Sequence, residues 1–427
     1  MRTTERALRG WFTGPPRPTR IADWLVVAIA VSLPWSTSAS AVLIVLWWIA
    51  VYPALGFTSI WHEIRTPAGG LPVAIWVFAV LGMLWADVSW SERLDGLRGF
   101  HKLLFIPLLL AQFRHSDRVK WAILAFLISS LALLTLSWLT PYPGFLGRPK
   151  ADVGVPVKDY VSQSMIFTIC AFGLLGHGAE LWQRGRIQLA MTAGLVGAAF
   201  LANILFVATA RATLLIIAVL FVLFGFRQFA WKGMLLAGLV AGVLASLAWV
   251  SSPYLRGRVT HVFVELQDYG GSSRSSAEPR LEYWKKSLEF IADAPVVGHG
   301  TGAIASQFRR TATATDNPHN QILAVAIDLG AVGTLLLLLM WIAHVALFRQ
   351  SGVLAWYGLT VVVANIVGSL FNTHLFDFTQ GWLYVFGVGI LGGAIGKQTH
   401  DWTTAPCGLR SNVLPYRNDA GDELPAK

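Results

Sequence analysis

A histidine at the start of a long apolar run is the clearest candidate for chemistry. In the stretch NPHNQIL, residues 317–323, Asn317 is a preferred helix N-cap and Pro318 suits the first helical position, which predicts His319 in the first turn of a helix. The positive end of a helix dipole disfavours imidazolium and attracts anions. A histidine that stays neutral near pH 7 is a competent general base. His319 is therefore a candidate base that deprotonates a hydroxyl beside a bound phosphate. The alternative is a capping or interfacial histidine.

Two arginines are candidates for stabilising negative charge. Arg211 lies in VATARATLL, a short polar break between two apolar runs. Charges near hydrocarbon are costly and usually face a bundle interior or a site, although an arginine can also extend to the lipid headgroups. Arg280 opens a predicted helix, where a solvated surface charge is the simpler interpretation. Guanidinium groups bind phosphate in a bidentate manner, so both arginines suit a phosphate ligand.

Four further residues are weaker candidates. Asp377, in the polar loop LFNTHLFDFTQGW, could orient a histidine or an acceptor hydroxyl, or pair with one of the arginines. His299, in VGHGTG, lies between glycines, where a histidine is more often a turn residue than a ligand. Arg148 and Lys158 lie in GRPKADVGVPVKDY and are secondary candidates for contacts with anionic groups of a substrate.

No cofactor is expected from the motifs. The chain contains no D-x-D, H-E-x-x-H or P-loop motif and no cysteine cluster. Its two cysteines, Cys170 in an apolar segment and Cys407 in the polar tail, are not expected to form a structural disulfide. The net charge of +10 is expected on cytoplasmic loops of a membrane protein, so it does not indicate a nucleic-acid partner.

The composition predicts an all-α polytopic membrane protein. Of the 427 residues, 55% are hydrophobic and only 13% are charged, whereas a soluble protein carries about 25% charged residues. The 19 tryptophans fit membrane interfaces.

The first 20 residues and the apolar run after them resemble a signal peptide without an A-x-A cleavage site, and we expect a retained first helix. About twelve runs are apolar enough to span, near 21–35, 39–56, 71–88, 101–113, 118–140, 160–180, 187–207, 211–227, 232–250, 319–348, 353–371 and 380–396. The fourth is short and contains Pro107, so a half-span is the alternative.

The basic residues predict the orientation. With the N-terminus in the cytoplasm, one side receives about 18 of the 33 lysines and arginines and the other about 7 in its short loops. This predicts that both termini are cytoplasmic. It also predicts four regions: nine spans within 1–250, a large loop on the outer side over 251–318, three spans within 319–396 and a cytoplasmic tail over 397–427.

The large loop is predicted to be partly helical. Ser276 is a plausible N-cap, and Pro279 falls in the first turn. An apolar stripe with spacings of three and four is predicted to pack on the membrane domain or to lie in the interface; it consists of Leu281, Trp284, Leu288 and Ile291. Pro295 and the glycines at 298, 300 and 302 are expected to end this helix.

Three short segments resemble the O-antigen ligase family of membrane glycosyltransferases. They are ATARATLL, with its arginine before a helix, RLEYWKKSLEFIADAPVVGHGTG, with an Arg-x-x-x-Trp helix and a glycine-rich turn, and NPHNQIL, with its Pro-His-Asn signature. The resemblance implies an undecaprenyl-diphosphate-linked glycan as donor and a sugar hydroxyl of lipid A–core as acceptor. It further implies His319 as general base, Arg211 and Arg280 as ligands of the diphosphate, Asp377 as a less secure match, and an inverting reaction without metal or nucleotide.

Other functions remain open from the sequence. The O-antigen polymerase and the protein O-oligosaccharyltransferase would share the donor and the histidine chemistry and differ only in the acceptor. A transporter or flippase of the lipid-linked glycan is the alternative from a different class, although transporters usually carry internal repeats and polar groups near the midplane. The sequence does not indicate an oligomeric state.

Overall fold

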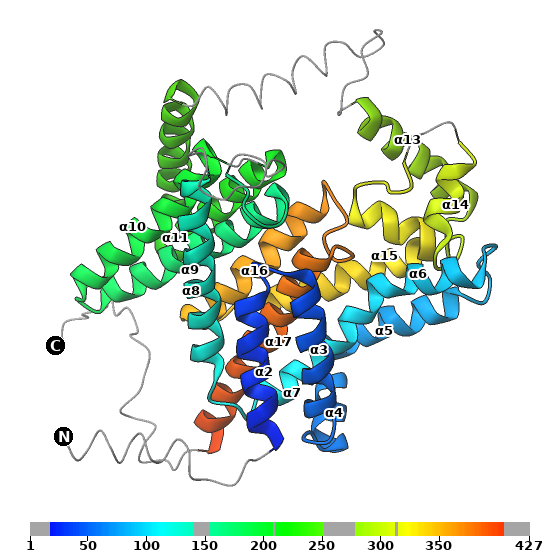
Figure 1. Ribbon diagram of the computed structural model, residues 1–427, viewed down its shortest axis with the longest axis horizontal. Coiled ribbons are helices and arrows are strands. Elements are labelled where there is room, and N and C mark those ends of the chain that lie inside the picture. Colours follow the sequence, from blue (N-terminus) through cyan, green and yellow to red (C-terminus); the bar gives the residue numbers. More distant parts are fainter. Residues whose placement is uncertain (1–17, 141–153, 208–209, 252–277, 312–314, 405–427) are drawn as a thin grey trace, which may run out of the picture.

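The computed structural model describes residues 18–140, 154–207, 210–251, 278–311 and 315–404, and their regular structure is helical (Figure 1). The helices are α2 (Pro18–Ser32), α3 (Thr37–Val51), α4 (Phe57–Ile64), α5 (Pro67–Gly82), α6 (Trp90–His101), the 3-10 helix η1 (Lys102–Leu104), α7 (Phe105–Phe113), α8 (Val119–Leu139), α9 (Tyr160–Gln183), α10 (Ile187–Phe206), α11 (Arg211–Ser251), α13 (Glu278–Asp293), α14 (Ala303–Arg309), α15 (Gln321–Leu347), α16 (Val353–Ser369) and α17 (Phe378–Thr404). The predicted all-helical fold is confirmed.

Twelve membrane spans are not found. By length and hydropathy, five helices of the described chain can cross a membrane, or six if the bent pair α4 and α5, which meet at 88°, counts as one span. Three further apolar helical stretches are shorter, at 10–17 residues: Thr37–Val51 (α3), Ala212–Gln228 within α11, and Val353–Ser369 (α16). The segment predicted at 101–113 forms η1 and the nine-residue α7, which continue from the polar helix α6. The helices describe a multi-pass membrane protein with fewer full-length spans than expected.

The eighth and ninth predicted spans form a single element. Helix α11 runs for 41 residues through the loop expected between 227 and 232. The sequence there contains neither glycine nor proline, only residues that a helix tolerates. Its polar Arg227 donates to the main-chain oxygens of Phe348 and Gln350 and needs no loop to be accommodated. The prediction of two separate helices was wrong because polarity alone does not end a helix.

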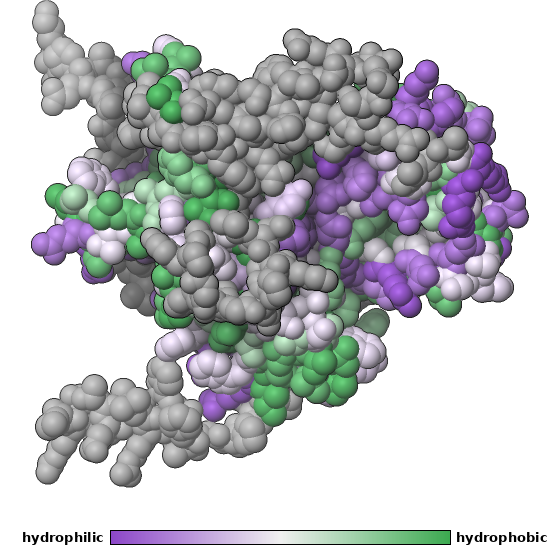
Figure 2. All heavy atoms as spheres, turned by 45° about the horizontal axis from the view of Figure 1, so that its top comes forward, coloured by the Kyte–Doolittle hydropathy of each residue, from purple (hydrophilic) through white to green (hydrophobic). Residues whose placement is uncertain are grey.

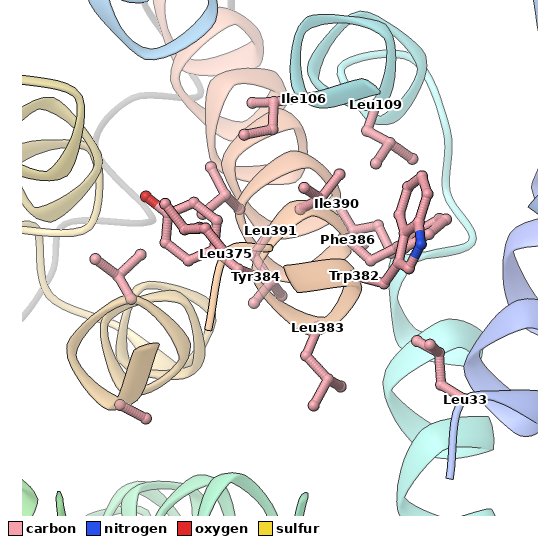
Figure 3. Close-up of a cluster of buried hydrophobic side chains, with 14 of the residues drawn as sticks. Leu33, Ile106, Leu109, Leu375, Trp382, Leu383, Tyr384, Phe386, Ile390 and Leu391 are labelled. Atoms are coloured by element: carbon pink, nitrogen blue, oxygen red, sulfur yellow. The ribbon is translucent and has the colours of Figure 1, made fainter. Parts of the chain in front are cut away.

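Helix α17 forms the centre of the packed bundle. Most of its apolar stretch is buried, and it packs against α7 and α16. Figure 3 shows its side chains Trp382, Leu383, Phe386 and Ile390 radiating from the helix, with Ile106 and Leu109 of α7 on one side. This core supports the loop that immediately precedes α17, which carries several of the candidate site residues.

Helix α15 is broken in the middle, and the glycine-rich turn after α13 fills the break. Gly330 has φ 61° and ψ −158°, which frees the carbonyls before it from helical bonding. The main-chain N–H groups of His299 and Gly300 donate to the oxygens of Ile327 and Asp328, both at 2.9 Å. A Cβ on Gly298, whose φ is 69°, would lie 2.5 Å from the backbone of Asp328. The turn therefore needs glycine, and it fixes α13 on the membrane domain.

Helix α13 confirms the predicted loop helix and half of its predicted apolar stripe. Trp284 and Ile291 are partly buried, and Ile291 packs against the cluster of Phe290, Phe308 and Ile327. Leu281 and Leu288 are 48% and 60% exposed. The buried face is rotated toward Tyr283 and Phe290, whose rings pack with Phe308 of α14. The predicted N-cap, Ser276, lies outside the described residues.

Candidate active site

Loops distant in sequence meet at one end of the bundle. We call residues 33–36, 154–159, 315–320 and 370–379 the loop cluster. Three side chains at the start of α15 tie this region to the loop before α17: Asn317 donates to Thr373 Oγ1 at 3.1 Å, Asn320 donates to the oxygen of Leu370 at 3.0 Å, and Gln321 Oε1 accepts from the N–H of Leu375 at 3.0 Å. The predicted site segments at 319 and 377 are therefore neighbours in space.

His319 precedes α15 and does not lie in its first turn. The helix begins at Gln321, and Asn320 is its N-cap, accepting from the N–H groups of Ile322 and Leu323 at 2.9 and 3.1 Å. Asn317, the predicted cap, accepts from the N–H of His319 at 2.8 Å. Two asparagines compete for the cap, and the nearer one makes it, so the helix begins later than predicted. His319 has a φ of 51°, in the left-handed region, and its ring is half-buried.

A chain of side chains leads from His319 to a carboxylate. Its Nδ1 lies 3.3 Å from Asn372 Oδ1, and Asn372 Nδ2 donates to Asp377 Oδ2 at 3.0 Å. Because a carboxylate only accepts, Asp377 fixes the amide so that its oxygen faces the histidine. The ring must then carry its proton on Nδ1, which leaves Nε2 as the bare acceptor. Within the described part of the chain, Nε2 makes no hydrogen bond.

Burial shapes the ionisation of this loop. Burial raises the pKa of Asp377 to about 6, while the nearby positive charge of Lys102 acts in the opposite direction. The Lys102 amine is itself buried and donates to the main-chain oxygens of Phe376 and Asp377 at 2.8 and 2.6 Å. His374, in the same loop, is buried, which lowers its pKa to about 4. Asp377 is thus ionised near neutral pH but close to its titration range, and His374 remains neutral.

Two segments singled out from the sequence are in direct contact. Trp284 of α13 donates from Nε1 to the oxygen of Pro318 at 3.1 Å. Tyr283 places its ring 6.2 Å from the ring of His319, measured between centroids. Arg280 lies three residues earlier on the same helix, and its side chain is exposed. The Arg-x-x-x-Trp helix therefore covers the Pro-His-Asn segment and places Arg280 near that side of the site.

Two hollows flank the loop before α17. One, of about 750 Å³, lies between α6, α14 and residues 316–317 and 373–378. The other, of about 600 Å³, is lined by Lys158, Asp159, Asn372 and Asp377. Lys158 donates to the oxygen of Leu33 at 2.5 Å and to Thr379 Oγ1 at 3.0 Å, and burial lowers its pKa to about 8. No group of three or more His, Cys, Asp or Glu residues that could hold a metal ion occurs in the described ranges.

Of the remaining candidates, one holds a turn and two are not described. The ring of His299 donates from Nε2 to the oxygen of Phe290 at 2.8 Å and so helps to hold the glycine-rich turn in place. Arg211 is the first residue of α11, but its side chain lies outside the described residues. Arg148 falls in a segment that the structure does not describe.

The sequence alone did not point to Asn372 or Lys102. Asn372 lies in the quoted loop beside His374 and Asp377, yet an asparagine in a turn is the usual case and gave no signal. Lys102 is one of the about seven basic residues that the predicted topology places in short loops on the outer side. That position was the available clue, because a buried lysine requires partners.

One family comparison bears on this arrangement. Residues 196–338 match the family model Wzy_C, described as O-Antigen ligase. The matched segment contains Arg211, Arg280, His299 and His319, whereas Asn372 and Asp377 lie beyond it. No curated protein matches the chain. The resemblance inferred from three short motifs is confirmed as a match to the O-antigen ligase family model over residues 196–338 of this multi-pass membrane protein.

Proposed function

We propose that the protein is a metal-independent, inverting glycosyltransferase, an O-antigen ligase. It would transfer a glycan from undecaprenyl diphosphate to a sugar hydroxyl of lipid A–core. The observation that carries this proposal is the chain from His319 through Asn372 to Asp377, formed where the matched family segment meets the loop before α17. The donor, the acceptor and the stereochemistry come from the family resemblance.

His319 acts as the general base in this proposal. Its Nε2 takes the proton of the acceptor hydroxyl while the oxygen attacks the anomeric carbon of the donor. The bond between that carbon and the diphosphate oxygen breaks, and the electron pair leaves with undecaprenyl diphosphate. Attack opposite the leaving group inverts the anomeric centre. Asn372 and Asp377 are positioning residues, because they set the ring orientation and stabilise its Nδ1 proton as the ring becomes positive.

Cationic side chains stabilise the departing diphosphate. Arg280 is exposed on the helix that covers His319 and is free to reach an anion. Lys158 lines a hollow together with Asn372 and Asp377 and is the second cation near the site. Arg211 is assigned the same role on its sequence context and the family match alone. Such groups accelerate transfer when they bind the charge of the transition state more tightly than that of the donor.

The loop cluster faces the periplasm in this proposal, with both termini of the inner-membrane protein in the cytoplasm. This orientation is the one predicted from the basic residues in the short loops between the twelve spans expected from the sequence. It agrees with the chemistry, because donor and acceptor would both be presented on that side.

Reconstitution tests the function and separates it from its alternatives. Purified protein in lipid nanodiscs receives an undecaprenyl-diphosphate-linked glycan together with lipid A–core, a second lipid-linked glycan or an acceptor peptide in turn. Mass spectrometry of the products identifies a ligase, a polymerase or a protein glycosyltransferase by the acceptor that gains mass. Movement of donor between leaflets with no product on any acceptor would instead indicate a transporter and contradict the proposal.

A further inference from the structure

The larger hollow beside the loop before α17 has no role in the chemistry described above. Its volume of about 750 Å³ is within the usual range for small-molecule sites. Figure 2 shows hydrophilic side chains gathered on one side of the molecule, at the right of the view, where Figure 1 places α6, α13 and α14. The hollow lies on this polar side between α6, α14 and residues 373–378.

The cations in the wall of the hollow are already balanced by acids. Arg98 lies 3.1 Å from Asp95, and Arg309 is paired with Glu92. The Lys102 amine is directed at main-chain oxygens next to the charge of Asp377. Each lysine and arginine in the described wall therefore has an acidic neighbour, and the exposed Asp316 adds a further negative charge. This wall does not suit a phosphate, but its carboxylates are good acceptors for ligand hydroxyl groups.

Aromatic rings form the wall next to α17. Phe105 and Phe378 are half-buried and pack around Trp382, with ring centroids 5.1 and 6.4 Å from it. Phe376 lines the same hollow from the loop. Aromatic rings and carboxylates that line one hollow suit a sugar, whose C–H groups can pack on the rings while its hydroxyls donate to the carboxylates.

The hollow is connected to the proposed base. Asn317 and Thr373 line it and are hydrogen-bonded to each other, and Asn317 also accepts from the main-chain N–H of His319. Asp377 lines both this hollow and the smaller one that contains Lys158. A ligand in the larger hollow and an anion in the smaller one would lie on either side of Asp377.

We propose that the larger hollow binds the uncharged terminal sugars of the acceptor. The smaller hollow is then left for the charged part of the donor. This inference rests on the proposed function, since it assigns one of the two substrates of that reaction to a place in the structure. It predicts that recognition of the acceptor depends on the aromatic wall and on Asp316, and not on phosphate groups of the acceptor.

Binding without turnover tests the assignment directly. The probe is delipidated, enzymatically dephosphorylated core oligosaccharide, titrated into nanodiscs that hold the full-length His319→Ala variant. Adding Phe378→Ala is expected to weaken binding roughly five- to tenfold through the lost ring contact. The matched control is Phe57→Ala, an exposed ring on α4, which is expected to leave binding unchanged. Asp316→Asn serves as a second variant with an exposed side chain, with the fully exposed Asp87→Asn as its control.

Kinetics separate this inference from the proposed function. In the otherwise wild-type protein, Phe378→Ala and Asp316→Asn are expected to raise KM for the acceptor while KM for the donor stays unchanged. If wild-type protein transfers glycan but both variants bind the acceptor as their controls do, the hollow is not the acceptor site. The same conclusion follows if the phosphorylated oligosaccharide binds and the dephosphorylated one does not. Absence of transfer by wild-type protein to any acceptor would refute the proposed function instead.

Discussion

His299 and His319 lie 20 positions apart, in the turn before α14 and in the segment before α15, and their rings have different kinds of partner. His299 donates from Nε2 to the main-chain oxygen of Phe290 and helps to hold the glycine-rich turn in the break of α15. His319 presents Nδ1 to the side-chain amide of Asn372 and leaves Nε2 without a partner in the described chain. Each ring has one nitrogen held by the fold, His299 by a main-chain oxygen and His319 by a side-chain amide that Asp377 holds in turn.

The difference lies in the partner of each ring. A main-chain oxygen is fixed and does not titrate, so it locks His299 in one tautomer at every pH where the ring is neutral. Asn372 is set by Asp377, whose pKa lies near 6, so the environment of His319 can change within the physiological range. The comparison predicts that His319 supports catalysis and His299 supports stability.

The largest expected effect is on transfer by His319→Ala. We expect the rate to fall by roughly 10²- to 10⁴-fold, the usual contribution of a general base. The half-buried ring contributes little packing, so the melting temperature is expected to remain close to that of the wild type. Single-turnover transfer and thermal unfolding are measured on the same nanodisc preparation. Full activity would remove the assignment of the base.

Asn372→Leu tests whether the Asn372 amide links the ring of His319 to the carboxylate of Asp377. The substitution removes both hydrogen bonds at similar volume, so the ring loses the group that selects its tautomer. We expect kcat to fall by about one to two orders of magnitude, less than on loss of the base itself. A kcat within twofold of the wild type would show that the ring needs no such partner.

The pH dependence of the transfer rate tests whether the charge of Asp377 matters for the environment of His319. Because its pKa is raised to about 6, Asp377 is ionised above that pH and becomes protonated below it. Protonation of Asp377 removes the negative charge that holds the Asn372 amide toward the ring, so part of the fall in rate in acid is expected to come from Asp377. In Asp377→Asn the acid limb is expected to become shallower, because this protonation is gone. An unchanged slope in this variant would exclude a role for the Asp377 charge.

His299→Ala has the smallest expected effect on catalysis and a clear effect on stability. Loss of the hydrogen bond to Phe290 leaves a partly buried oxygen unsatisfied, which costs about 1–3 kcal/mol of unfolding free energy. We expect a melting temperature lower by several degrees and a transfer rate within about threefold of the wild type. A large loss of kcat without a change in stability would reverse the roles assigned to the two residues.

Much of the architecture was predictable from apolar periodicity. Each predicted span falls on a helix, and the loop helix at 278–293 was also expected, because long apolar runs and helix signals are local properties. The continuous α11 and the buried face of α13 were not predicted. Helix continuity depends on the absence of breakers, and the buried face depends on which neighbour supplies the larger contact, here Phe308 and Ile327.

The candidate site was predictable only in part. His319 and Asp377 were selected for their chemistry, and the structure joins them through Asn372. The asparagine itself carries no local signal, and the choice of Asn320 over Asn317 as helix cap depends on how the chain turns at His319. These features arise from the packing of residues 315–320 against 370–379, which a single sequence does not encode in any local pattern.

The most direct test of the central claim is a double-mutant cycle between His319→Ala and Asp377→Ala, with kcat measured at saturating donor and acceptor. If Asp377 acts through the ring of His319, removing it from a protein that already lacks the ring costs nothing further. We therefore predict that the double variant has the same kcat as His319→Ala alone. Two losses that multiply would show that the carboxylate and the imidazole act independently, and the account of the site would be wrong.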